Sequence, residues 1–86
     1  MSFSIVTIPP FELNFKRLLK KYPSPKADLQ ALIDVLAENP TFGIPLGENC
    51  FKIRLAIRSK NKGKSGGARL ITMVKFEQER MVLLTI

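Results

Sequence analysis

The chain has 86 residues, enough for one small domain, and 45% of them are apolar, which favours a folded protein over a disordered basic tail. The net charge of +7 predicts an anionic partner: RNA, DNA, an acidic protein or a membrane surface. A single cysteine excludes an internal disulfide and fits a reduced, cytoplasmic setting. We expect neither export nor a membrane span, since there is no basic leader and no apolar run of about 18 residues.

The first half of the chain predicts a strand followed by two helices. Phe3 to Ile8 is rich in β-forming residues and ends at Pro9-Pro10, where a helix can begin because proline is tolerated in a first turn. Pro23 ends this helix, and a second begins after Ser24 and stops at Asn39-Pro40. The residues at helical spacing, expected to face a core, are Phe11, Phe15, Leu18, Leu19 and Tyr22 in the first helix and Leu29, Leu32, Ile33 and Leu36 in the second.

The second half predicts three strands. Residues 41–49 contain Gly43, Pro45 and Gly47, so we expect an ordered loop there without regular structure. Apolar and basic residues then alternate over 51–58, which is typical of a strand with two different faces. After a polar, glycine-rich loop the chain returns as a strand over 68–74, turns at 77–79 and ends with a strand over 81–86.

These elements predict an α+β domain over residues 1–86 with the order β-α-α-β-β-β. We expect a four-stranded, mainly antiparallel sheet, covered on one face by a helical hairpin. The last three strands should form an antiparallel meander, and the sequence leaves open which edge receives the first strand.

Cations gather on the predicted hairpin. Between Asn49 and Phe76 the chain has eight Lys or Arg and no Asp or Glu. Such a surface binds phosphate groups before anything else. The loop lysines could equally be solvated charges, whereas Arg54 and Arg69 occupy strand positions where a neutral β-former would pack better.

Composition excludes several enzyme classes. The sequence has no histidine, one cysteine and no clustered carboxylates, so neither a zinc site, a catalytic triad nor a two-metal nuclease site is expected. We expect no cofactor. The reaction that stays compatible with this composition is metal-free cleavage of RNA, in which the 2′-hydroxyl attacks the adjacent phosphorus. It needs a base for the hydroxyl, a cation for the charge that develops on the phosphate and an acid for the leaving 5′-oxygen.

The run Lys52-Ile53-Arg54, the spaced lysines of the loop and the segment from Gly66 to Ile71 resemble the RelE/ParE superfamily of bacterial type II toxins, most closely the RelE- and HigB-like branch. The resemblance implies a domain that cuts mRNA on the ribosome and is held silent by a cognate antitoxin. It also implies roles for individual residues. The residues expected to act on the scissile phosphate are Arg54, Lys62, Lys64 and Arg69, and those expected to bind RNA are Lys52, Arg58 and Lys60.

The sequence departs from the family at its end. Relatives usually continue past the last strand with a tyrosine- or lysine-bearing segment and a short helix, whereas this sequence stops at Ile86, and its one tyrosine, Tyr22, falls in a predicted helix. We therefore expect a form without that segment. Two alternatives stay open: a ParE-like inhibitor of gyrase, and a truncated, non-catalytic module that binds RNA or antitoxin.

The helix pair can cover only one face of the sheet, so apolar groups on the other face predict a partner site. We expect Ile71, Met73 and Leu83 to bind an antitoxin segment that carries apolar anchors and acidic residues.

Overall fold

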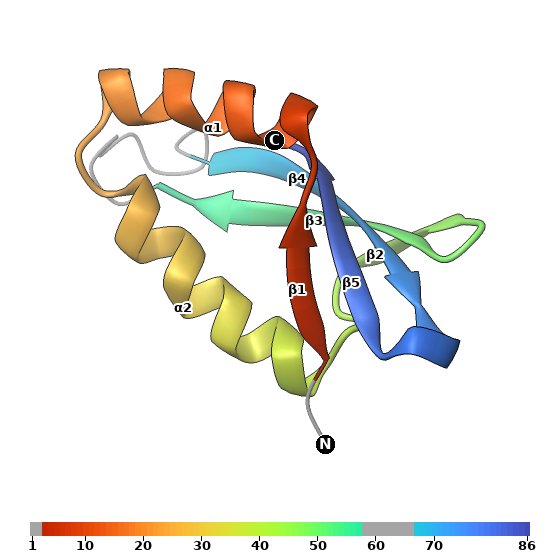
Figure 1. Cartoon of the computed structure of the whole chain (residues 1–86). Helices are drawn as coiled ribbons and strands as arrows, with labels where there is room; N and C mark the ends of the chain where they lie inside the picture. Colours follow the sequence, from red (N-terminus) through yellow and green to blue (C-terminus); the bar gives the residue numbers. More distant parts are fainter. Residues whose placement is uncertain (1–2, 58–66) are drawn as a thin grey trace.

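The computed structural model describes residues 3–57 and 67–86, and within them two helices and five strands form an α+β fold (Figure 1). The predicted class is confirmed. The elements follow one another as β1 (Ser4–Thr7), α1 (Pro9–Lys21), α2 (Pro25–Glu38), β2 (Ile44–Gly47), β3 (Cys50–Ala56), β4 (Gly67–Lys75), the 3-10 turn η3 (Phe76–Gln78) and β5 (Arg80–Thr85). In this part of the chain no helix is long and apolar enough to cross a membrane.

The strands form one sheet in the order β1-β5-β4-β3-β2. The strand β4 is antiparallel to both β3 and β5, as the predicted meander requires. The first strand lies beside β5 and runs parallel to it, with Ser4 opposite Arg80 and Thr7 opposite Leu83. Two helices between β1 and the rest of the sheet supply the long connection that this parallel pairing needs.

The predicted loop over 41–49 is wrong, because Ile44–Gly47 forms β2 and gives the sheet a fifth strand. Proline is compatible with a strand at a sheet edge, and Pro45 lies in the edge strand β2 opposite Phe51. Gly43 has a φ of +115°, and a Cβ there would lie 2.7 Å from the Lys52 carbonyl oxygen and 2.7 Å from Ile53 Cγ1. The glycine therefore allows the chain to approach β3 closely and enter β2.

The helices begin as their sequences indicate, and most of the predicted residues pack on the core. Leu19 is an exception, because it was predicted to face the core and is 38% exposed. Prolines occupy the first turn of each helix, where the missing N–H costs no hydrogen bond. In α1 the Phe11 ring is 2% exposed and stacks on Phe15 with 5.6 Å between ring centroids. In α2 the Ser24 hydroxyl donates a 2.6 Å hydrogen bond to Asp28 Oδ2, and Leu29 and Leu36 are buried.

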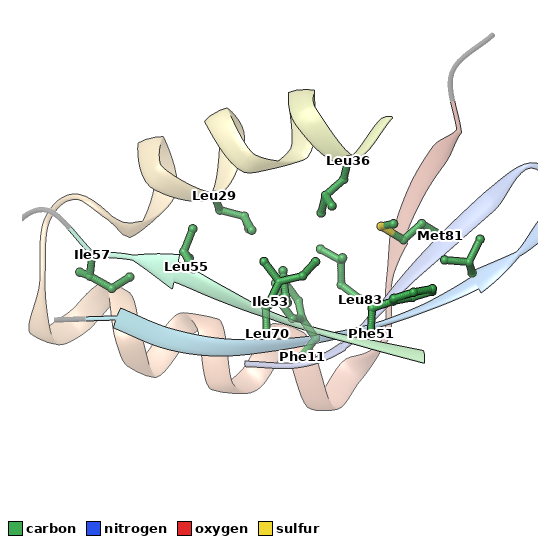
Figure 2. Packing of buried hydrophobic residues seen from close by; sticks show 11 residues of the cluster. Phe11, Leu29, Leu36, Phe51, Ile53, Leu55, Ile57, Leu70, Met81 and Leu83 are labelled. Atoms are coloured by element: carbon green, nitrogen blue, oxygen red, sulfur yellow. The ribbon is translucent and has the colours of Figure 1, made fainter. Parts of the chain in front are cut away.

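Both helices lie over one face of the sheet, and the core fills the space between (Figures 1 and 2). Alternate residues of β3 point into it, as the period-two pattern predicts, and meet residues of α1, α2, β4 and β5. The buried cluster consists of Phe11, Leu29, Leu36, Phe51, Ile53, Leu55, Ile57, Leu70, Val74, Met81 and Leu83.

The structure corrects the prediction that Leu83 binds a partner. Leu83 is 0% exposed and pairs with Thr72, which also faces the core. Cross-strand partners project to the same face of a sheet, so β5 presents Met81 and Leu83 to the helices. The face opposite the helices, here called the open face, instead receives Val82 of β5 and Ile71 and Met73 of β4.

Candidate anion-binding site

Two arginines meet on the open face. The core-facing residues of β3 leave Lys52 and Arg54 on the opposite side of the strand, and Arg69 occupies the equivalent position in β4. The register places Arg54 directly opposite Arg69, and Lys52 opposite Ile71. Three cations predicted from the sequence are thus brought to one region by two adjacent strands.

The pairing of Arg54 with Arg69 opposes two like charges across a ladder, an arrangement that destabilises a sheet by itself. Both side chains are exposed, and neither has an ion-pair partner within residues 3–57 and 67–86. The segment from Asn49 to Phe76 contains no acidic residue that could separate them. An anion bound between the guanidinium groups would replace this repulsion with two attractive contacts.

A cavity of about 420 Å³ lies at this point and is lined by Ile44, Lys52, Ile53, Arg54, Gly67 and Arg69. Gly67 shapes it, because a Cβ there would lie 2.8 Å from Arg54 Cγ and 3.1 Å from Arg54 Nη1. The absence of a side chain thus lets Arg54 lie across the start of β4. The sequence assigned no role here to Ile44 or Gly67. The Gly66-Gly67 pair was the available signal, because glycine in a strand often marks a place where another group approaches the backbone closely.

The remaining predicted residues divide into two groups. Arg58, Lys60, Lys62 and Lys64 lie outside the described residues, so their predicted roles stay predictions. Ile71 and Met73 lie half-buried on the open face. Tyr22 follows α1 and packs against the core, and it does not line the cavity.

An apolar strip continues across the open face from the cavity. Met73 pairs with Cys50 of β3 on one side and with Val82 of β5 on the other. Val82 in turn pairs with Val6 of β1. Val82 is only 7% exposed although no helix of the described chain covers this face. Beyond the strip a second pair of opposed cations, Lys75 and Arg80, stands at the far end of β4 and β5.

The site can bind a phosphate group and stabilise negative charge that develops on it, since arginine offers several donors in one plane. Its described lining residues include no histidine, carboxylate, cysteine or tyrosine, and Lys52 is the general acid–base residue type among them. Among the described residues no group of three or more His, Cys, Asp or Glu could hold a metal ion.

Comparison of the sequence with protein-family models and with curated proteins found no match. A solved structure is similar: a double arginine-to-alanine mutant of the E. coli toxin RelE in the free state. The match has a TM-score of 0.69 at 18% sequence identity and covers 99% of this chain and 81% of that chain. At this identity the likeness shows a shared fold, and the chain therefore has a RelE-like fold.

Proposed function

We propose that the chain is the toxin of a type II toxin–antitoxin pair, a RelE- and HigB-like domain over residues 1–86 that cuts mRNA on the ribosome. One observation carries the proposal: an opposed Arg54–Arg69 pair on the open face of a RelE-like fold. A solved neighbour with that fold is named a toxin. Both arginines line the same cavity, and two facing cations in one cavity favour an anionic ligand.

The proposed reaction is an internal transfer within the RNA. The 2′-oxygen attacks the adjacent phosphorus and gives up its proton, the bond to the 5′-oxygen breaks, and a proton is delivered to that leaving oxygen. Arg54 and Arg69 stabilise the negative charge on the non-bridging oxygens, and Lys52 holds the RNA beside them. We assign the proton transfers to the loop lysines Lys62 and Lys64, which the resemblance implies act on the scissile phosphate. Arg58 and Lys60 would extend the contact with the RNA backbone.

The test is a translation reaction in which mRNA ends are mapped after the purified chain is added. The wild type should cut within translated codons, and Arg54→Gln with Arg69→Gln should lower the cutting rate by roughly 100-fold or more, as expected for lost stabilisation of an oxyanion. Lys75→Gln with Arg80→Gln is the matched control, because it removes two opposed cations from the far end of the same strands. Equal losses in both double variants would show that net charge, not the site, governs activity.

The same reaction separates the two alternatives. Intact mRNA together with inhibited gyrase would favour a ParE-like inhibitor. RNA binding without cuts would favour a non-catalytic module. In either case the ribonuclease proposal is rejected.

The proposed partners are the ribosome, its mRNA and a cognate antitoxin, and the proposed location of the protein is the cytoplasm. The antitoxin segment would lay apolar anchors on Ile71 and Met73 and acidic residues near Arg69. Opposite charges speed the encounter, while apolar burial holds the complex, so high salt should weaken binding only modestly. Hydrogen exchange of the co-expressed complex should show protection over residues 69–73, and protection confined to the helices would overturn this placement.

A further inference from the structure

One wall of the anion-binding cavity is apolar. Ile44 of β2 lines the cavity, and its side chain is 58% exposed although it is large and apolar. The cations Lys52, Arg54 and Arg69 line the same cavity. Its volume of about 420 Å³ falls in the range of small-molecule sites and exceeds what a single phosphate group fills. The cavity therefore has room for a ligand that is anionic at one end and apolar at the other.

The fold fixes Ile44 beside Lys52. The two residues are cross-strand partners in β2 and β3, so both side chains project from the open face. The preceding Gly43 lies so close to β3 that a Cβ there would be 2.7 Å from the Lys52 carbonyl oxygen. This close approach holds the start of the edge strand against its neighbour. The backbone thus sets the position of Ile44 relative to the cations.

The cationic and apolar groups occupy successive rows across the strands. Arg54 pairs with Arg69 in one row. Ile44 pairs with Lys52 in the next row, two residues away along β3. Two residues of a strand span about 7 Å, which is close to the separation of the phosphate and the base within one nucleotide. Lys52 also supplies N–H donors beside the apolar wall, and the edge of a nucleobase carries acceptors for them, whereas a hydrocarbon chain carries none.

We propose that the cavity binds a whole nucleotide and that Ile44 is the wall against which its base lies. The phosphate binds between Arg54 and Arg69, and the edge of the base is directed toward Lys52. Every base has a flat face that can lie on an apolar side chain, so Ile44 should strengthen the binding of all four bases rather than read their sequence.

The inference rests on the proposed function and deepens it. A base held against Ile44 restricts the ribose to which it is attached, and with it the 2′-hydroxyl that attacks the phosphorus. Such restriction favours a reaction between groups of one molecule, because less freedom is lost on the way to the transition state. In that reaction Ile44 is a positioning residue.

Titration of the full-length chain with adenosine 5′-monophosphate and with ribose 5-phosphate tests the proposal, because the two compounds differ in the base alone. The wild type should bind the nucleotide about five- to tenfold more tightly. Ile44→Ala should remove most of this advantage and leave the affinity for ribose 5-phosphate unchanged, while Ile44→Leu should retain it. Leu46→Ala is the matched control, because Leu46 is a 52% exposed residue of the same strand that does not line the cavity.

Methyl NMR of the wild type provides a direct readout that needs no change in the site. The ring current of a bound base should shift the Ile44 methyl signals, which the Ile44→Ala spectrum identifies, and ribose 5-phosphate should leave them in place. Three results would overturn the proposal: equal affinities of the wild type for the two compounds, equal effects of Ile44→Ala and Leu46→Ala, or Ile44 methyl signals that the nucleotide does not shift.

The proposed function and the base-binding wall can fail separately. Base-dependent binding together with intact mRNA would reject the ribonuclease and leave the nucleotide site in place. Cut mRNA without base-dependent binding would reject the role of Ile44 and leave the ribonuclease in place.

Discussion

Replacing Arg69 with glutamine should make the fold more stable while it weakens RNA binding. Arg54 and Arg69 are direct partners in the ladder, and directly opposed residues have Cβ atoms about 5 Å apart. Two unit charges at about 5 Å in water repel by roughly 0.8 kcal/mol, an upper value here because exposed side chains can splay apart and salt screens them. For a domain of this size 1 kcal/mol moves the Tm by about 4–8 °C, so we expect a rise of at most a few degrees at low salt.

A double-mutant cycle measures the repulsion itself. Thermal unfolding of the wild type, Arg54→Gln, Arg69→Gln and the double variant is followed by circular dichroism at about 10 mM and about 1 M salt, where the screening length falls from about 30 Å to about 3 Å. Because either substitution alone removes the repulsion, the double variant should gain less than the sum of the two single gains. This difference should vanish at high salt. Inorganic pyrophosphate should raise the Tm of the wild type more than that of either variant.

The reasoning is refuted if the gains simply add at low salt, or if the cycle reports an attraction. Either result would mean that the two guanidinium groups do not share one electrostatic site. An unchanged affinity for RNA in the Arg69→Gln variant would independently separate this pair from the proposed substrate.

Further predictions concern the core and the edge strand. Thr72 is fully buried and its hydroxyl has no hydrogen-bond partner among residues 3–57 and 67–86, so Thr72→Val should raise the free energy of unfolding in urea by about 1 kcal/mol, and a loss would reveal a partner for the hydroxyl. Gly43→Ala should destabilise more than Gly47→Ala in the same assay, because both have positive φ but only Gly43 meets neighbours within 4 Å. Leu36→Ala should cost about 2–5 kcal/mol in urea denaturation, since its side chain is fully buried. RNA affinity should fall with salt less steeply in the Arg54→Gln variant, by roughly one unit of log–log slope per lost phosphate contact.

Local pattern predicted the fold well wherever one face of an element is buried. The alternation over 51–58 correctly places Phe51, Ile53, Leu55 and Ile57 in the core, and the helical repeats correctly place Leu29 and Leu36 there. The edge strand β2 was missed because glycine and proline usually mark loops, and only pairing with β3 makes a strand of it. The position of β1 beside β5 depends on contacts between distant segments, which local patterns do not encode.

The sequence predicted which residues form the site but not how they are arranged. The sequence identified Arg54 and Arg69 as unusual strand residues, yet their direct opposition depends on the register between β3 and β4, which no local pattern encodes. The prediction for Leu83 chose the wrong face of the sheet. Residues 81–84 are all apolar, so their pattern does not indicate which of them face the core. The contribution of Gly67 became visible only once Arg54 was seen to lie against it.

The position of β5 between β1 and β4 also determines when, during synthesis of the chain, the sheet can be completed. Of the described strands Arg80–Thr85 is the last to be synthesised, yet it occupies an interior place in the sheet and pairs with residues 4–7. Contacts between segments so far apart in sequence slow folding, because a long loop must close before they form. Until residues 80–85 have been made, β1 has no neighbour in the sheet, and the core lacks Met81 and Leu83. A growing chain therefore cannot complete the sheet that carries the arginine pair while the ribosome is still translating its earlier codons.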